Sequence, residues 1–271
     1  MLATSRAWRH DGLTIGLVPT MGALHAGHMS LIERACRENS RVVVSIFVNP
    51  IQFGPKEDLD RYPRSPEQDL RLMQQAGVAA VYAPSAQVMY PPQAATRVRV
   101  SGVGEILEGA FRPGHFEGVA TVVAKLFEAA QPDTAYFGQK DAQQVAVVKR
   151  VAQDLDTGVR IIVCGTVREP DGLALSSRNA YLGPEERQSA SCLSFALDRA
   201  ARAYKAGDRD FKELRTGIQE VLQAEPLAKV EYLELVDPDT FVPPGTLAVM
   251  AVWFGKTRLI DNADLAKPFP G

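Results

Sequence analysis

Short apolar runs alternate with amphipathic stretches through the first two thirds of the chain. The strand-like runs, bounded by Gly and Pro, cover residues 13–19, 42–48, 78–82, 133–137 and 159–163. The stretches with helical periodicity cover residues 28–38, 66–75, 118–130 and 142–154. Short β-rich runs of this kind suit buried parallel strands, and their alternation with helices is typical of βαβ units. The pattern predicts an α/β fold with a doubly wound parallel sheet.

The pattern changes after residue 182. We expect helices over residues 183–206 and 208–225, and then strands over residues 230–236, 247–254 and 257–261. Helices followed by antiparallel strands predict a smaller α+β domain. We place the boundary near residue 180, which gives one domain of residues 1–180 and a second of residues 181–271.

Composition narrows the class of protein. No apolar run approaches the roughly 18 residues that span a bilayer, and the N-terminal segment has no apolar stretch typical of a secretory signal. We therefore expect a cytoplasmic protein with no membrane role. A net charge of −2 and a pI near 6.1 give no overall basic field for nucleic acid, so small anionic substrates fit better.

Two histidines three residues apart, His25 and His28, form an H-x-G-H sequence directly after the run of residues 13–19. The motif is predicted to lie at a strand-to-helix corner, where backbone N–H groups and the positive end of a helix can face a phosphate. Gly22 and Gly27 allow close approach of the backbone, and each imidazole supplies donors. Taken alone, the motif fits a glycine turn with two surface histidines equally well; its place after a strand favours phosphate binding.

Two further segments carry donors suited to phosphates. Lys140 follows another strand and offers a point charge, while Asp141 can accept from a ribose hydroxyl or cap the next helix. Ser176, Ser177 and Arg178 form a donor-rich loop, which is either a lid over phosphates or a serine-rich interdomain turn. Three such loops in one α/β chain together favour a nucleotide site.

Carboxamides and acids complete the candidate site. Asn49 and Gln52 carry donors and acceptors suited to a substrate with hydroxyl and carboxylate groups, although both could bond only their own turn. His115 falls in a loop or at a helix start, where a structural role is favoured. Three acidic residues allow a magnesium interpretation, although such acids are usually solvated: Asp58, Asp60 and Asp69.

Four blocks of sequence, in order, resemble the pantoate–β-alanine ligases of the nucleotidylyltransferase superfamily. They are residues 19–28, 47–53, 138–141 and 167–179. The resemblance runs over nearly the whole chain. It implies a Rossmann-like N-terminal domain, a smaller C-terminal lid domain and a homodimer.

The resemblance also implies a reaction. Pantoate would attack the α-phosphate of ATP to give pantoyl adenylate and pyrophosphate. The amine of β-alanine would then displace AMP and form the C–N bond of pantothenate, a precursor of coenzyme A. The implied partners are ATP, pantoate, β-alanine and Mg²⁺, with no nucleic acid and no membrane.

The resemblance assigns roles to individual residues. The catalytic residues would be His28, His25, Lys140 and Arg178. ATP would be bound by Met21, Gly22, His25, Gly27, His28, Gly138, Lys140, Asp141, Val167, Leu175, Ser176, Ser177 and Arg178. Gln52 and Gln144 would hold the pantoyl group, with Asn49 as a further substrate-binding residue, and Asp69 would bind magnesium.

The chain departs from the usual family sequence at Gln139, where Glu is usual, at Gly165, where Pro is usual, and at Leu175, where Met is frequent. Two other functions stay open: a different H-x-G-H adenylyltransferase, and a nucleotide-binding protein without catalysis. The former enzymes are typically smaller and lack the second phosphate block. Intact His25, His28, Lys140 and Arg178 count against the latter.

Overall fold

The computed structural model describes residues 1–55 and 57–269, which fall into two compact units. The first unit holds residues 1–138 and 143–164; the second holds residues 139–142 and the chain from residue 165 on. Residues 165–180, predicted to belong to the first domain, thus group with the second unit. One physical reason is a buried ion pair that joins Arg168 to Asp261 near the end of the chain.

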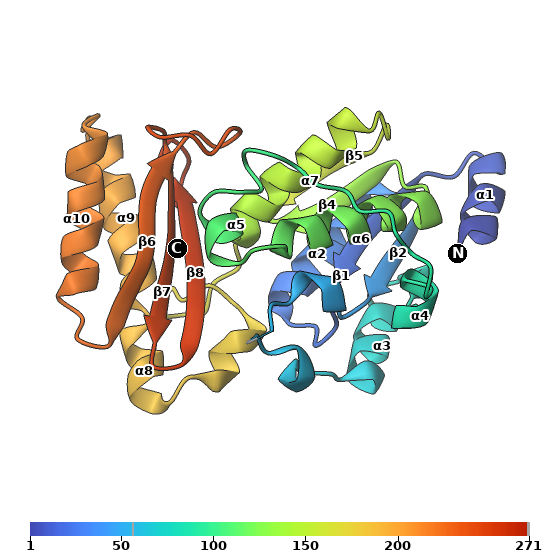
Figure 1. Ribbon diagram of the computed structural model, residues 1–271, viewed down its shortest axis with the longest axis horizontal. Helices are drawn as coiled ribbons and strands as arrows, with labels where there is room; N and C mark the ends of the chain where they lie inside the picture. Colours follow the sequence, from blue (N-terminus) through green and yellow to red (C-terminus); the bar gives the residue numbers. More distant parts are fainter. Residues whose placement is uncertain (56, 270–271) are drawn as a thin grey trace. The chain divides into compact units, whose positions relative to one another are not determined.

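The first unit is built on a five-stranded parallel sheet with strand order β3-β2-β1-β4-β5 (Figure 1). Its strands are β1 (Ile15–Thr20), β2 (Arg41–Ile46), β3 (Ala80–Tyr82), β4 (Thr134–Gly138) and β5 (Arg160–Cys164). All five predicted strands are confirmed. Its helices are α1 (Leu2–His10), α2 (Ala26–Glu38), α3 (Pro66–Gln75), α4 (Ala86–Met89), α5 (Glu108–Phe111), α6 (His115–Ala130) and α7 (Ala142–Asp154).

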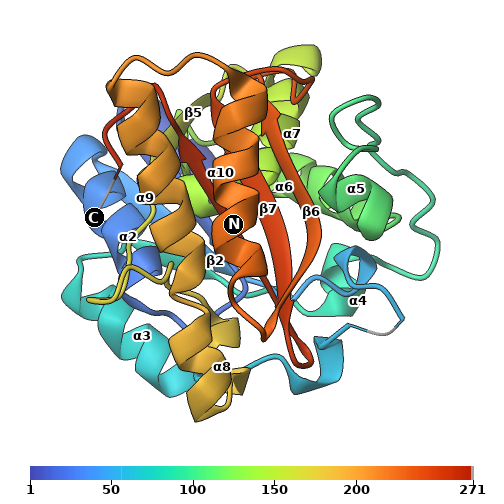
Figure 2. The same ribbon diagram turned by 90° about the vertical axis from the view of Figure 1, so that its left-hand side faces the viewer.

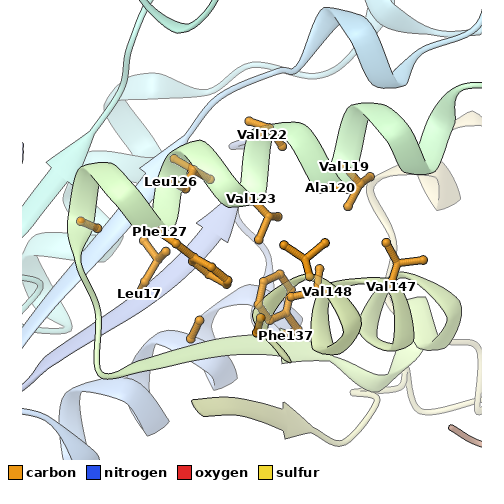
Figure 3. Packing of buried hydrophobic residues seen from close by; sticks show 14 of the residues in the cluster. Leu17, Val119, Ala120, Val122, Val123, Leu126, Phe127, Phe137, Val147 and Val148 are labelled. Carbon is orange, nitrogen blue, oxygen red and sulfur yellow. The ribbon is translucent and has the colours of Figure 1, made fainter. Parts of the chain in front are cut away.

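Both faces of this sheet are covered. Leu17 of β1 belongs to the buried cluster that includes residues of α6 and α7, and Figure 3 shows it beside Phe127. Val18, the next residue of β1, belongs to the cluster that includes residues of α2 and α3. This alternation places helices on both faces, because successive side chains of a strand point to opposite sides. The predicted doubly wound α/β fold is confirmed. No described helix is long and apolar enough to cross a membrane.

The second unit contains an antiparallel sheet of order β6-β7-β8. Its strands are β6 (Ala228–Val236), β7 (Leu247–Phe254) and β8 (Thr257–Asp264), and its helices are α8 (Pro184–Ser189), α9 (Cys192–Lys205) and α10 (Phe211–Gln223). Helices α9 and α10 lie side by side on one face of the sheet (Figures 1 and 2). Buried Leu214, Ile218 and Leu222 recur every four residues along α10, the spacing of one helix face. The predicted smaller α+β unit is confirmed.

The single helix expected over residues 183–206 is wrong. The chain forms α8 and α9 instead, with Ala190 and Ser191 between them. The Ser191 hydroxyl donates to the Gln188 carbonyl, and the Ser194 hydroxyl donates to the Ser191 carbonyl. Such side-chain bonds compete with the regular helix ladder and explain the break.

Candidate active site

The sheet of the first unit has a topological switch point beside its central strand. From β1 the chain moves outward through β2 to β3, whereas β4 and β5 lie on the opposite side of β1. Ligands of open parallel sheets bind beyond the carboxyl ends of the strands at such a point. Thr20 ends β1 and Gly138 ends β4, so the segments that follow both strands begin at this edge.

A buried carboxylate fixes the turn that follows β1. Asp69 of α3 is 1% exposed, and its two oxygens accept hydrogen bonds from the backbone N–H groups of Ala23 at 2.9 Å and Leu24 at 2.8 Å. Gly22 has a φ of +83°, and a Cβ there would lie 3.1 Å from Asp69 Oδ2. The turn therefore requires glycine at residue 22 and is shaped by the carboxylate behind it.

The two histidines of the motif cap α2 reciprocally. His25 Nδ1 accepts from the Gly27 N–H at 3.2 Å, and His28 Nδ1 accepts from the His25 N–H at 3.4 Å. Because Nδ1 is the acceptor in both rings, Nε2 carries the hydrogen of each neutral imidazole. The ring centroids lie 4.1 Å apart, and the first turn of α2 has no acidic residue. Two paired donors at the positive end of a helix suit a phosphate group.

The structure gives Asp69 a structural role in the turn, and its binding of magnesium stays a prediction. Both of its oxygens already accept backbone hydrogen bonds. Among the described residues no group of three or more His, Cys, Asp or Glu side chains could hold a metal ion. At nucleotide sites Mg²⁺ is held by one or two carboxylates together with substrate phosphates and water, so a single carboxylate such as Asp69 is compatible with the prediction.

The loop after β2 buries two carboxamides. Asn49 is 1% exposed, and its Nδ2 donates to Gln52 Oε1 at 2.9 Å and to the Gly118 carbonyl at 3.1 Å. Gln52 Nε2 in turn lies 3.4 Å from Met21 Sδ. The structure thus brings together three residues that the sequence assigned to substrates, Met21, Asn49 and Gln52.

The backbone of Gln52 is held by α6. His115 Nε2 lies 3.1 Å from Arg112 Nη1 and must accept, because a guanidinium can only donate. The ring hydrogen therefore lies on Nδ1, which donates to the Gln52 carbonyl at 2.8 Å. Arg112 also makes two hydrogen bonds to Glu57 at 2.7 and 2.8 Å. Burial, together with the smaller effect of the charge of Arg112, lowers the pKa of His115 to about 4. His115 begins α6 and, as a neutral side chain, links Arg112 to the loop after β2 that carries Gln52.

In the second unit, Asn262 of β8 fixes the segment that carries Lys140. The Asn262 amide donates to the carbonyls of Gln139 at 3.0 Å and Lys140 at 2.9 Å, and it accepts from Gln139 Nε2 at 3.1 Å. Lys140 Nζ lies 3.7 Å from Asp141 Oδ1. Gln139, which stands where the family usually has Glu, therefore has Asn262 as a hydrogen-bond partner. Nothing in the sequence around Asn262 predicts this contact.

Residues 167–175 form a tight hairpin. Arg168 pairs with Ala174 in an antiparallel bridge, and the Leu175 N–H donates to the Val167 carbonyl at 3.0 Å. Arg168 makes two hydrogen bonds to Asp261 at 2.7 and 3.0 Å, and the two side chains are only 3% and 0% exposed. The pair fixes the base of the hairpin, which carries two of the residues assigned to ATP, Val167 and Leu175.

The serine loop follows this hairpin. The Ser176 hydroxyl accepts from the Arg178 N–H at 3.3 Å and so caps the short 3₁₀ helix Ser177–Tyr181. At the tip of the hairpin, Arg187 pairs with Glu169 and Asp171, and this guanidinium lowers the pKa of Asp171. Ser177 is half-buried, as is Gln144, which lies in the first turn of α7 in the first unit.

Comparison with known proteins identifies the family. A family model described as pantoate-beta-alanine ligase matches residues 1–264. The chain belongs to this family. The pantothenate synthetase of Chloroflexus aggregans is 54% identical to it, and the match covers 96% of this chain and 96% of that protein. The pantothenate synthetase of Rubrobacter xylanophilus is 52% identical, and the match covers 96% of this chain and 94% of that protein.

Solved structures of family members match the fold. The pantothenate synthetase of Thermus thermophilus superposes with a TM-score of 0.92 at 48% identity and 98% coverage of both chains. The ligase of Francisella tularensis, complexed with beta-gamma ATP and beta-alanine, gives a TM-score of 0.81 at 36% identity, with 99% of this chain and 97% of that one covered.

Proposed function

We propose that this member of the pantoate–β-alanine ligase family joins (R)-pantoate to β-alanine with the cleavage of ATP to AMP and pyrophosphate. The observation that carries the proposal is the family match over residues 1–264. The Francisella relative, complexed with beta-gamma ATP and beta-alanine, supports two of the three substrates.

In the first step, an oxygen of the pantoate carboxylate bonds to the α-phosphorus while the bond to pyrophosphate breaks. Charge spreads over the phosphate oxygens, so catalysis consists mainly of positioning and of donors aimed at that charge. We assign this role to the Nε2–H groups of His25 and His28, with Lys140 and Arg178 as cationic groups. No protein nucleophile is required.

In the second step, the amine of β-alanine attacks the acyl carbon of the adenylate, the C–O bond to AMP breaks, and the amine loses a proton. We assign the pantoyl group to Gln52, Asn49 and Gln144, with Gln52 also close to β-alanine. The remaining residues proposed to bind ATP are Met21, Gly22, Gly27, Gly138, Asp141, Val167, Leu175, Ser176 and Ser177. We further expect a homodimer in the cytoplasm, and Mg²⁺ that arrives with ATP.

The test is AMP release from the purified chain with ATP, pantoate and β-alanine, and with each substrate omitted in turn. We expect AMP only when all three are present. AMP release that does not depend on β-alanine would reject the ligase activity, and release that does not depend on pantoate would favour a different adenylyltransferase.

A further inference from the structure

The amide of Asn49 has only one possible orientation. One of its two amide atoms lies 3.1 Å from the carbonyl oxygen of Gly118. A carbonyl oxygen can only accept, so this atom must be the nitrogen. Asn49 Oδ1 therefore faces the hydroxyl of Tyr90 at 2.9 Å, and the hydroxyl must donate.

The orientation of Asn49 sets that of Gln52. The same nitrogen of Asn49 lies 2.9 Å from the Gln52 amide, whose facing atom must be the oxygen, Oε1. The Gln52 nitrogen is left on the other side, 3.4 Å from Met21 Sδ. A thioether is a weak acceptor, which a carboxylate or hydroxyl oxygen outcompetes. The chain of hydrogen bonds from Tyr90 through Asn49 thus makes Gln52 a donor.

The backbone of Gln52 is fixed by contacts other than the side-chain hydrogen bonds that run from Tyr90 through Asn49. His115 donates to its carbonyl, and a Cβ at Gly118 would lie 2.7 Å from both its N and its Cα. The Tyr90 hydroxyl therefore acts on the side chain of Gln52 and not on the path of the loop.

Tyr90 is suited to a fixed donor role. Its ring packs on the apolar cluster of the first unit, 6.0 Å from the ring of Phe47 between centroids. Burial raises the pKa of Tyr90 to about 12, so the hydroxyl keeps its proton at neutral pH. Asn49 is almost fully buried, and without that hydroxyl its Oδ1 would lose this donor in a place where a replacement from water is costly.

We propose that Tyr90 is a positioning residue for the hydroxy-acid substrate: its hydroxyl fixes the amide of Asn49, and through it Gln52, so that Gln52 offers an N–H donor to an acceptor oxygen of the substrate. The inference rests on the proposed function, because it takes Gln52 as a pantoate-binding residue. It adds a residue outside the four sequence blocks and a direction for the hydrogen bond.

The test is a double-mutant cycle of Tyr90→Phe with Gln52→Ala. Tyr90→Phe alone should lower kcat/KM for pantoate about tenfold, as expected for a lost buried hydrogen bond, with KM for ATP changed less than twofold. In the Gln52→Ala background the same substitution should change kcat/KM less than twofold. Tyr82→Phe is the matched control, because Tyr82 packs on the same cluster outside the Asn49 chain, and it should have less than a twofold effect.

Equal losses in the two backgrounds, or equal losses for ATP and pantoate, would overturn the role of Tyr90. Gln52→Glu tests the direction separately, because it keeps the acceptor that faces Asn49 and replaces the donor with an oxygen. It should lose as much pantoate kcat/KM as Gln52→Ala, and wild-type values would overturn the proposal even if Tyr90→Phe failed to fold. If the wild-type chain makes no AMP from the three substrates, the proposed function itself is rejected. If the chain is active but Tyr90→Phe causes equal losses in the two backgrounds, only the role of Tyr90 is rejected.

Discussion

The two candidate phosphate loops are held by different forces. In the first unit, the turn before His25 is fixed by the buried carboxylate of Asp69 on backbone N–H groups. In the second unit, the hairpin before Ser176 is fixed by guanidinium pairs whose exposure grows from base to tip, from 3% for Arg168 to 28% for Arg187. Buried pairs are costly to break and exposed pairs are screened by water and salt. We therefore expect the first loop to be rigid and the second to be loosest at its tip.

The largest expected effect is at the base of the hairpin. Arg168→Met leaves the carboxylate of Asp261 buried without its guanidinium and should lower the free energy of unfolding by about 3–5 kcal/mol. Arg187→Met is the matched control at the half-exposed tip and should cost less than about 1 kcal/mol. Urea unfolding followed by circular dichroism measures both, and similar losses would remove the contrast between base and tip.

The next effect concerns the turn in the first unit. Asp69→Asn keeps the size of the side chain but turns an N–H group toward backbone donors, which should cost about 1.5–3 kcal/mol of stability. Because the turn leads into His25, kcat for adenylation should also fall. Glu67→Gln, on the exposed side of the same helix, is the control. Unchanged stability and activity in Asp69→Asn would show that the carboxylate does not hold the turn.

The third prediction is a pH dependence from His115. An unfolded chain protonates this residue below about pH 6.5, whereas the folded chain resists protonation down to about pH 4. The free energy of unfolding should therefore fall with pH through this window, by about 2 kcal/mol between pH 7 and pH 5. His115→Asn, which keeps a donor for the Gln52 carbonyl, should remove that part of the slope. His10→Asn, at a side chain 90% exposed, should leave the slope unchanged; an equal change in both variants would contradict the assignment.

The smallest effect is expected in the serine loop. Ser177→Ala combined with Arg178→Ala should raise the KM for ATP about tenfold, or about 1.4 kcal/mol, and change pantoate binding less. Isothermal titration calorimetry with each substrate separates the two affinities. A larger loss for pantoate would reject the assignment of this loop to phosphates.

Local sequence patterns predicted the strands and the placement of the motifs. Periodicity located all five parallel strands, and the H-x-G-H motif was correctly placed at a strand-to-helix corner, where His25 caps α2. The contacts that fix the site escaped prediction because they join residues far apart in the chain. Asp69 lies 45 residues from Leu24, and Tyr90 lies 41 from Asn49. From sequence alone, Asp69 is predicted to be solvated or metal-binding, because only the fold shows the backbone N–H groups that its carboxylate faces.

His28 is the residue that we propose to stabilise the α-phosphate as pantoyl adenylate forms. The most direct measurement is the exchange of labelled pyrophosphate into ATP without β-alanine, in the wild type and in His28→Ala. We predict exchange that requires pantoate and that is about 10²–10³ slower in the variant, equivalent to about 2.7–4 kcal/mol. Exchange at a near wild-type rate in His28→Ala would contradict this role of His28.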